Sequence, residues 1–326
     1  MPGGGTSTFT DPNDYQANLR EARLDLVLTG AGGFRARLTW ATLHQFHLLR
    51  SEEELPRIAY VSLAPELVFV GFTERADPPM LWDGDELQPG EIIIHSRAEQ
   101  FHQRTTGPSR WCLIGVAPDH LGQYGAALSG RPLPLPAAAR ILRPASRHAR
   151  RLVRLHAQAC RLAETKPRVL AHPEVARAIE QGIIQALVTC LSTARTRGNG
   201  IGKRHHERIM VRLEEALAEH LGQPLRMPEL CALIGATDRT LRSCCTEFLG
   251  LSPSQYVLLR RLKQARRLLR DADPATASVA EIARECGFIQ LGRFAGAYRT
   301  LFGETPSATL RQQPESALTP KLAESA

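Results

Sequence analysis

The chain has 326 residues, of which 43% are hydrophobic and 23% are charged, with a formal net charge of +8. This length and composition exclude a short peptide, a collagen and a disordered chain, and they allow one or two buried cores. No apolar run approaches the ~20 residues of a membrane-spanning helix, and the N-terminus lacks the basic and apolar segments of a secretory signal. We therefore expect a cytoplasmic protein that makes no membrane contact.

The seven cysteines predict neither a disulfide framework nor a zinc ribbon. Their number is odd, no C-x-x-C pair occurs, and Cys244 and Cys245 are adjacent. We expect most of them to be small buried apolar residues. The positive net charge favours an acidic partner such as nucleic acid.

Residues 1–20 are expected to form a flexible N-terminal arm, followed by a β-rich domain at residues 21–195. Between residues 21 and 118, six short apolar stretches are bounded by Gly, Pro, Asp and Asn, among them LDLVLTG, IAYVSLA and WCLIGVA. This pattern is typical of antiparallel strands in an all-β barrel or sandwich. The expected fold class of this half is a barrel with C-terminal helices of its own.

From about Pro144 the apolar period changes to three and four residues, which predicts helices within residues 146–195. One apolar stripe runs along the second helix and contains Val175, Ile179, Ile183, Leu187 and Leu191. Such a stripe is compatible with core packing against the barrel and with a helix–helix dimer seam. The sequence alone does not separate these alternatives.

Residues 196–206 are predicted to be a linker, because this region is rich in Gly and basic residues and almost free of apolar ones. Residues 203–313 carry 17 Lys and Arg against 12 Asp and Glu, whereas the remainder carries 24 against 21. The shorter C-terminal part therefore holds most of the excess positive charge. Residues 313–326 are expected to form a flexible tail.

Beyond the linker the pattern is wholly helical. A short helix, MPELCALI, ends at Gly235, and a second begins after Thr237 as the N-cap, with Asp238 in its first turn. Two helices joined by a tight Gly turn, the second with exposed basic residues, are typical of a helix-turn-helix unit. The second helix of such a unit enters the major groove of DNA.

A long helix is predicted from Ser252-Pro253, because Ser can cap it and Pro suits the first helical position. One face is apolar and the rest is crowded with Arg. We expect these arginines to form mainly a solvated face whose stems cover apolar neighbours, with phosphate contact as the alternative.

After this helix the first pattern recurs as SVAEIARECGF followed by IQLGRFAGAYRTLFG. In both copies a small residue lies four positions before a Gly: Cys231 before Gly235, and Ala283 before Gly287. A pattern of two helix-turn-helix units bridged by one helix is a much more specific sequence signal than a single unit, because chance rarely reproduces both the spacing and the connector.

The second unit contains the series Ile282-Ala283, Gly287-Phe288, Phe294, Tyr298, Phe302-Gly303 and Pro306. The first unit contains Gly235, Thr237, Arg239, Thr240, Leu241, Gly250, Ser252-Pro253 and the connector run RRLKQARRLL. With these motifs, residues 207–312 resemble the DNA-binding domain of the AraC/XylS transcription regulators. Two positions depart from that pattern, since Cys231 replaces the usual Ala and Cys245 stands where a core Phe is common.

The β-rich half resembles by pattern the cupin-like ligand and dimerisation domain that many members of this family carry, with LQPGEIIIHS similar to its Pro-Gly strand start. The resemblance implies an activator that binds double-stranded DNA, senses a small-molecule effector, forms a homodimer and contacts RNA polymerase. No motif of an enzyme is visible, and we expect the protein not to be one.

On the first recognition helix, apolar spacing directs Leu241 and Phe248 inward and leaves a polar set outward. Arg suits the paired acceptors of guanine, and Ser or Thr can reach a base or a phosphate. The predicted DNA-binding residues of this unit are Thr237, Arg239, Thr240, Arg242 and Ser243. The family resemblance places base reading at Arg239, Arg242 and Ser243.

The second recognition helix presents a different set, namely Gln290, Gly292, Arg293 and Gly296. Glycine offers a base no side-chain contact, so this unit is predicted to read bases more weakly. Arg293 and Gln290 would then provide most of its readout.

Two groups of residues are candidate metal ligands: His44 with His47, and His95 with His102 and Glu99. A metal site in a cupin needs three or four converging ligands, and neither group has that spacing. We therefore expect no metal and no cofactor. Two alternatives stay open, a metal-dependent cupin enzyme fused to a DNA-binding domain and a purely architectural DNA binder.

Overall fold

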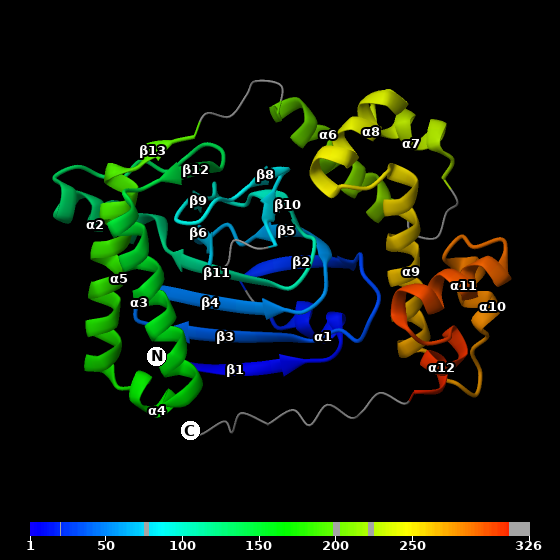
Figure 1. The fold of residues 1–326 in the computed structure, drawn as a ribbon, viewed down its shortest axis with the longest axis horizontal. Coiled ribbons are helices and arrows are strands. Elements are labelled where there is room, and N and C mark those ends of the chain that lie inside the picture. Colours follow the sequence, from blue (N-terminus) through cyan, green and yellow to red (C-terminus); the bar gives the residue numbers. More distant parts are fainter. Residues whose placement is uncertain (20, 75–77, 198–202, 221–224, 313–326) are drawn as a thin grey trace.

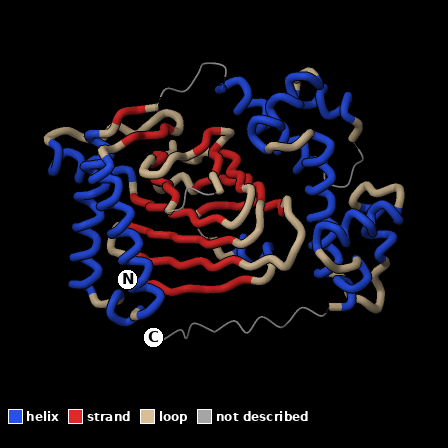
Figure 2. Tube along the Cα trace, in the orientation of Figure 1, coloured by secondary structure: helices blue, strands red, loops and turns tan. Residues whose placement is uncertain are grey.

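The computed structural model describes residues 1–19, 21–74, 78–197, 203–220 and 225–312. Two β-sheets with helices form the N-terminal part, and a separate group of helices forms the C-terminal part (Figures 1 and 2). None of the described helices combines the length and apolar character that a membrane span requires. The expected tail at 313–326 and the middle of the expected linker, residues 198–202, lie outside the described residues.

The strands of the N-terminal half pair antiparallel in two sheets. The larger sheet has the order β1 (Gly3–Phe9), β3 (Ala36–Thr42), β4 (Phe46–Glu53), β11 (Ser109–Val116), β6 (Val68–Thr73), β9 (Ile92–Ile94), β12 (Arg140–Arg143) and β13 (Arg195–Thr196). The smaller sheet has the order β2 (Ala22–Leu28), β5 (Arg57–Leu63), β10 (Gln100–Thr105), β7 (Met80–Trp82) and β8 (Asp85–Glu86).

Side-chain alternation on the strands explains the layers. On β11, Trp111 and Leu113 belong to the core between the two sheets, whereas Cys112 and Ile114 belong to a second core under the helices. The fold is therefore sandwich-like. The expectation of a barrel is wrong, because in the described chain the sheets are not closed on each other and β1 and β13 remain end strands. Short alternating antiparallel strands are common to barrels and sandwiches, so the pattern could not distinguish them.

The expected flexible arm at residues 1–20 is also wrong. All seven residues of β1 pair with β3, from Gly3 opposite Thr42 to Phe9 opposite Ala36, and α1 (Pro12–Ala17) follows. A run of glycines suggests a flexible segment, but here the missing side chain at Gly4 allows the strand to lie close to Leu170. A Cβ on Gly4 would lie 2.7 Å from a methyl group of Leu170.

Helices cover the outer face of the larger sheet (Figure 1). They are α2 (Pro118–Ser129), α3 (Ser146–Thr165), α4 (Pro167–Leu170) and α5 (Pro173–Thr193), and α3 packs against α5. The apolar stripe predicted on α5 places Ile183 and Leu187 fully inside the core of this single chain. The stripe is therefore core at these two positions and is not free to be a dimer seam.

The C-terminal part contains two short helix pairs that both contact one long helix, α9 (Pro253–Asp271). The remaining helices are α6 (Lys203–Glu219), α7 (Met227–Ile234), α8 (Asp238–Leu249), α10 (Val279–Glu285), α11 (Leu291–Phe302) and α12 (Pro306–Arg311). The pair α7 and α8 and the pair α10 and α11 lie toward opposite ends of α9 (Figure 1). The expected linker 196–206 overlaps these elements, because β13 reaches Thr196 and α6 begins at Lys203.

The helical part packs against the smaller sheet. Val27 on β2 and Ile58 on β5 are buried in the same apolar cluster as Leu241 and Phe248 of α8. The helix α9 contacts β2, and both α6 and α8 contact β10. The outer face of the smaller sheet is thus covered by the C-terminal helices.

Candidate nucleic-acid interface

The turn of the first helix pair depends on Gly235, which has φ +68° and ends α7. That left-handed conformation strains most L residues and suits Gly. The side chain of Thr237 then caps α8 by accepting a hydrogen bond from the backbone N–H of Thr240 at 3.1 Å. The predicted helix start is confirmed.

The turn of the second helix pair is closed by the same backbone hydrogen bond as the turn of the first. The backbone N–H of Ala236 donates to the carbonyl of Cys231 at 3.1 Å, and that of Phe288 donates to Ala283 at 2.9 Å. Gly287 has φ +78°, as Gly235 has a positive φ in the first pair. Because both units close with the same hydrogen bond across a left-handed Gly, the predicted internal repeat is confirmed.

On α8 the inward and outward residues separate as the spacing predicts. The buried face consists of Leu241, Cys244, Cys245, Phe248 and Leu249. Arg239, Arg242 and Ser243 are exposed, and Thr240 is half-buried. The polar residues therefore form one accessible face over the first two turns of the helix.

The two arginines of this face differ in their surroundings. Arg242 Nε lies 2.8 Å from Asp238 Oδ2, and both side chains are more than half exposed. The hydrogen bond from Arg242 to Asp238 and the charge of that carboxylate raise the pKa of the guanidinium. Arg239 forms no ion pair with the described residues, so its whole guanidinium fork is available to a ligand.

On α11 the buried residues are Phe294, Tyr298 and Leu301. All four predicted residues of this unit are exposed, namely Gln290, Gly292, Arg293 and Gly296. A Cβ at either glycine would meet nothing within 4 Å among the described residues. The glycines are therefore not required by packing inside the chain, and they leave a smooth stretch of helix surface.

One exposed residue in the connection between α10 and α11 was not predicted from the sequence. Ile289, directly before Gln290, is 85% exposed. Nothing in the sequence predicted Ile289 on the surface, because apolar residues are normally assigned to the buried core. In a DNA complex a side chain of this kind suits the methyl group of thymine.

The cations of α9 contradict the expectation of a mainly solvated face. Arg260 is 9% exposed and its Nη1 lies 2.7 Å from Asp25 Oδ2 on β2 and 3.1 Å from Glu214 Oε2 on α6. Glu214 also accepts from Tyr256 at 2.5 Å, and its Oε1 lies 2.9 Å from His102 Nε2 on β10. A buried polar network therefore joins the sheet to the helical part.

Burial alone would raise the pKa of Glu214 and of Asp25. In Glu214 the charge of Arg260 and the hydrogen bonds from His102 and Tyr256 outweigh burial, so the pKa is lowered. In Asp25 the nearby charges of Lys263 and Arg260 do the same. Both groups are carboxylates in the folded chain.

Two further cations of α9 bind the N-terminal segment. Arg266 Nη1 lies 2.7 Å from Asp11 Oδ2, and Arg270 pairs with the same carboxylate oxygen. Lys263 pairs with Asp25 and donates to Gln16 at 2.8 Å. The phosphate-contact alternative would require these side chains to leave partners that they already hold.

The histidines of the two candidate metal-ligand groups do not converge on one point. His44 lies in a loop with Nε2 3.2 Å from the carbonyl of Pro173, and His47 lies on β4. His95 is buried, stacks on Phe101 at 4.5 Å between ring centroids and has Nδ1 3.6 Å from Glu99. His102 faces Glu214 instead.

Another set of residues does converge in the described part of the chain. Ligand-type atoms of Glu74, Cys112 and His156 all lie within 4.8 Å of one another. The three residues are dozens of positions apart in sequence, so no motif could have indicated them.

Comparison with known proteins matches residues 230–312 to the family described as "Helix-turn-helix domain". The probable thc operon regulatory protein of Rhodococcus erythropolis is 39% identical over 98 residues, which make up 30% of either chain. The XylDLEGF operon transcriptional activator of Pseudomonas putida is 37% identical over 101 residues, 31% of this chain and 32% of that protein. The chain thus spans about a third of the length of these relatives.

Two solved structures are also similar. The AraC-like transcriptional activator CuxR is 17% identical with a TM-score of 0.41, and the match covers 86% of this chain and 98% of that chain. A probable AraC family transcriptional regulator from Rhodopseudomonas palustris is 36% identical with a TM-score of 0.30, and the match covers 32% of this chain and 98% of that chain.

Proposed function

Since the chain belongs to the AraC/XylS family by its C-terminal helix-turn-helix domain, we propose that it is a sequence-specific transcription regulator that binds double-stranded DNA. The family consists of transcription regulators and not of enzymes. The alternative of a metal-dependent cupin enzyme is accordingly set aside.

The single observation that carries this proposal is the repeated unit. Two helix pairs, closed by the same hydrogen bond across Gly235 and Gly287, are attached to one helix. Each pair exposes the first turns of its second helix, where Arg239, Arg242 and Arg293 lie. In a helix-turn-helix protein these positions face base edges in the major groove.

In the proposed complex α8 and α11 enter successive major grooves about one helical turn, ~34 Å, apart. Arg239, Arg242 and Ser243 read bases, while Thr237 and Thr240 contact phosphate at the helix start. The second unit reads fewer bases through Gln290 and Arg293. The open backbone at Gly292 and Gly296 lets α11 approach the groove wall closely.

The N-terminal domain, residues 21–195, is proposed to bind a small-molecule effector and to pair two subunits. As an activator in the cytoplasm, the protein would contact RNA polymerase from its DNA site. The network around Arg260 supports coupling of the two parts, because it connects α9 directly to β2 and, through Glu214 of α6, to β10.

The test is a selection of random duplexes by the full-length protein in the presence of excess non-specific competitor DNA. The expected result is an enriched motif with two blocks about one helical turn apart. The double variant Arg239→Ala, Arg242→Ala should lose the enrichment at one block while its circular dichroism stays unchanged.

Binding without any enriched motif would instead favour the architectural DNA binder. The effector is sought by thermal shift of the full-length chain against small metabolites, since a ligand of the native state raises the melting temperature.

A further inference from the structure

A basic groove runs along the first half of α3, on the side of the molecule opposite the helix-turn-helix units (Figure 1). Its walls are α3, the residues at the end of β6 and the turn at Pro89 and Gly90, and we call it the α3 groove. Its volume is about 780 Å³, within the roughly 300–1,000 Å³ that small-molecule sites occupy. Four exposed arginines of α3 line it, namely Arg147, Arg150, Arg151 and Arg154.

Small side chains keep the groove open between these arginines. Ala149, Val153 and Ala157 follow one another at a spacing of four, so they share one face of α3 and line the groove. Gly90 has φ +83°, and a Cβ at this position would lie 3.8 Å from the Cβ of Ala149. Long side chains at these positions would fill the space, so the hollow follows directly from the sequence.

The arginines of the groove have no carboxylate partner. Arg150 Nε donates to the carbonyl of Ser146 at 3.3 Å, and Arg151 Nη2 donates to the side chain of Gln185 at 3.3 Å. Within the described chain, none of the four arginines forms an ion pair with Asp or Glu. Most of their N–H donors, and all four positive charges, are therefore available to a ligand.

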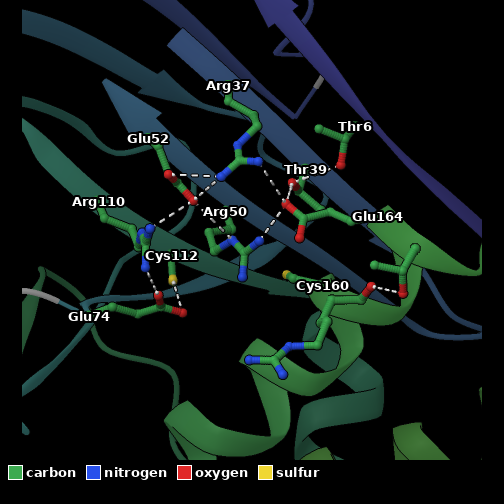
Figure 3. A network of polar contacts seen from close by, with 12 residues as sticks. Thr6, Arg37, Thr39, Arg50, Glu52, Glu74, Arg110, Cys112, Cys160 and Glu164 are labelled. Atoms are coloured by element: carbon green, nitrogen blue, oxygen red, sulfur yellow. Dashed lines mark hydrogen bonds and ion pairs between the residues drawn. The ribbon is translucent and has the colours of Figure 1, made fainter. Parts of the chain in front are cut away.

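The carboxylates of the adjacent network are already held by other guanidiniums. Figure 3 shows these pairs, which are Arg37 with Glu52, Arg50 with Glu164 and Arg110 with Glu74. Glu74 is the one carboxylate among the described residues that line the groove. Its Oε2 lies 3.3 Å from Arg110 Nη1, and its Oε1 accepts from Cys112 Sγ at 3.5 Å. Because Arg110 balances this charge, the groove keeps its positive excess.

We propose that the α3 groove binds a small molecule with at least two phosphate groups, and this proposal rests on the proposed effector role of the N-terminal domain. A terminal phosphate carries about −1.5 to −2 charges at pH 7, so two of them balance the four guanidiniums. The planar fork of Arg bonds two phosphate oxygens at once. Arg147 and Arg154 are roughly 10 Å apart along the helix axis, so one phosphate cannot engage all four side chains.

The position of the groove separates it from the proposed DNA site. The helix α3 covers the outer face of the larger sheet, whereas α8 and α11 lie at the other end of the molecule (Figure 1). A straight duplex bound to both recognition helices would not reach the groove. The charge of the groove therefore fits a separate anionic ligand.

The experiment is titration calorimetry of the full-length protein with tripolyphosphate, at about 0.15 M salt, where attraction between distant surface charges is screened. Inorganic phosphate is the control with a single phosphate group. We expect one saturable tripolyphosphate site per chain and an affinity for inorganic phosphate that is weaker by about tenfold or more. Absence of saturable tripolyphosphate binding would overturn the proposal.

Two double variants assign the site. Arg150→Ala, Arg154→Ala removes two exposed arginines of the groove and should weaken tripolyphosphate binding by about tenfold or more, because charge-assisted hydrogen bonds are lost. The matched control Arg161→Ala, Arg168→Ala removes the same charge from exposed positions outside the groove and should bind like the wild type. Equal affinities in the two folded variants would contradict the assignment.

The selection of random duplexes described above keeps this proposal distinct from the proposed function. An enriched DNA motif without a tripolyphosphate site would overturn the ligand of the groove alone. A tripolyphosphate site that depends on Arg150 and Arg154, without any enriched motif, would support the groove and contradict the regulator. If the wild type binds no tripolyphosphate and Arg150→Ala, Arg154→Ala loses affinity for duplex DNA, the groove belongs to nucleic acid and the proposal is wrong.

Discussion

The guanidinium of Arg260 lies 2.7 Å from the carboxylate of Asp25, so an ion pair holds the helix that connects the two helix-turn-helix units to the smaller sheet. Lys263 pairs with the same carboxylate. Movement of the DNA-binding part away from the sheet must therefore break charged contacts, and these contacts offer a direct way to test how the two parts are coupled.

Asp25→Asn should loosen this contact. After the change, Arg260 still pairs with Glu214 and Lys263 still bonds to Gln16. Because the Asp25 side chain is 35% exposed, we expect the free energy of unfolding to fall by about 1–2 kcal/mol. The melting temperature should fall, and small-angle scattering should show a larger radius of gyration. The control is Asp14→Asn on the exposed face of α1. Equal radii for wild type and Asp25→Asn would contradict the prediction.

Acid should weaken the same contact. The pKa values of Glu214 and Asp25 are lowered in the folded chain, so the unfolded state binds more protons in this range. The stabilisation is complete above the ordinary carboxyl pKa of about 4 and is lost as the pH falls through the folded values. Melting temperature against pH should therefore drop below about pH 4. Glu214→Gln, which cannot ionise, should flatten that drop.

Arg242→Ala should lower the affinity for the specific site by about 1–3 kcal/mol and relax the preference at one base pair. Non-specific binding should fall less. The matched control is Arg284→Ala, an exposed arginine on α10 outside both recognition helices. Measured affinities across single-base variants of the site decide the matter, and an unchanged base preference would show that Arg242 is not a reader.

The two half-sites should differ in stringency. The second recognition helix has Gly292 and Gly296 on its exposed face, where the first has Arg242 and Ser243. Single base changes should therefore cost more in the half-site of α8 than in that of α11. Equal losses in both halves would refute this division of labour.

Ile183→Asp should destabilise the N-terminal domain and not simply separate subunits. Ile183 is fully buried against the larger sheet, so the change places an unpaired charge in a dry core at a cost of roughly 4 kcal/mol or more. Circular dichroism should show a loss of cooperative unfolding. The control Gln181→Asp changes an exposed residue of the same helix. A stably folded, monomeric Ile183→Asp variant would support the seam alternative instead.

Local features of the helical part were predictable from sequence. The helix Asp238–Leu249, its Thr237 cap and its Gly250 end depend on nearby residues alone, and the repeat supplied a second copy of the same signals. The outward position of Arg239 and Arg242 followed from the helical period and the inward Leu241.

Contacts between distant segments were not predictable. The pairing of Arg266 with Asp11 joins residues 255 positions apart, and no local pattern distinguishes a solvated arginine from one held by a distant carboxylate. For the same reason Gly3–Phe9 was mistaken for a flexible arm, since its strand exists only beside β3. The approach of Glu74, Cys112 and His156 likewise requires three separate segments of the chain to meet.

The shared apolar cluster around Val27 and Ile58 has a consequence for engineering. Although the sequence changes character near residue 200, the first helix-turn-helix unit completes its packing with side chains from β2 and β5. A chimaera that joins this DNA-binding part to another N-terminal half would expose that apolar face or meet a surface of the wrong shape. Exchange of specificity between relatives should therefore transplant the exposed residues of α8 and α11 and leave the joint between the halves intact.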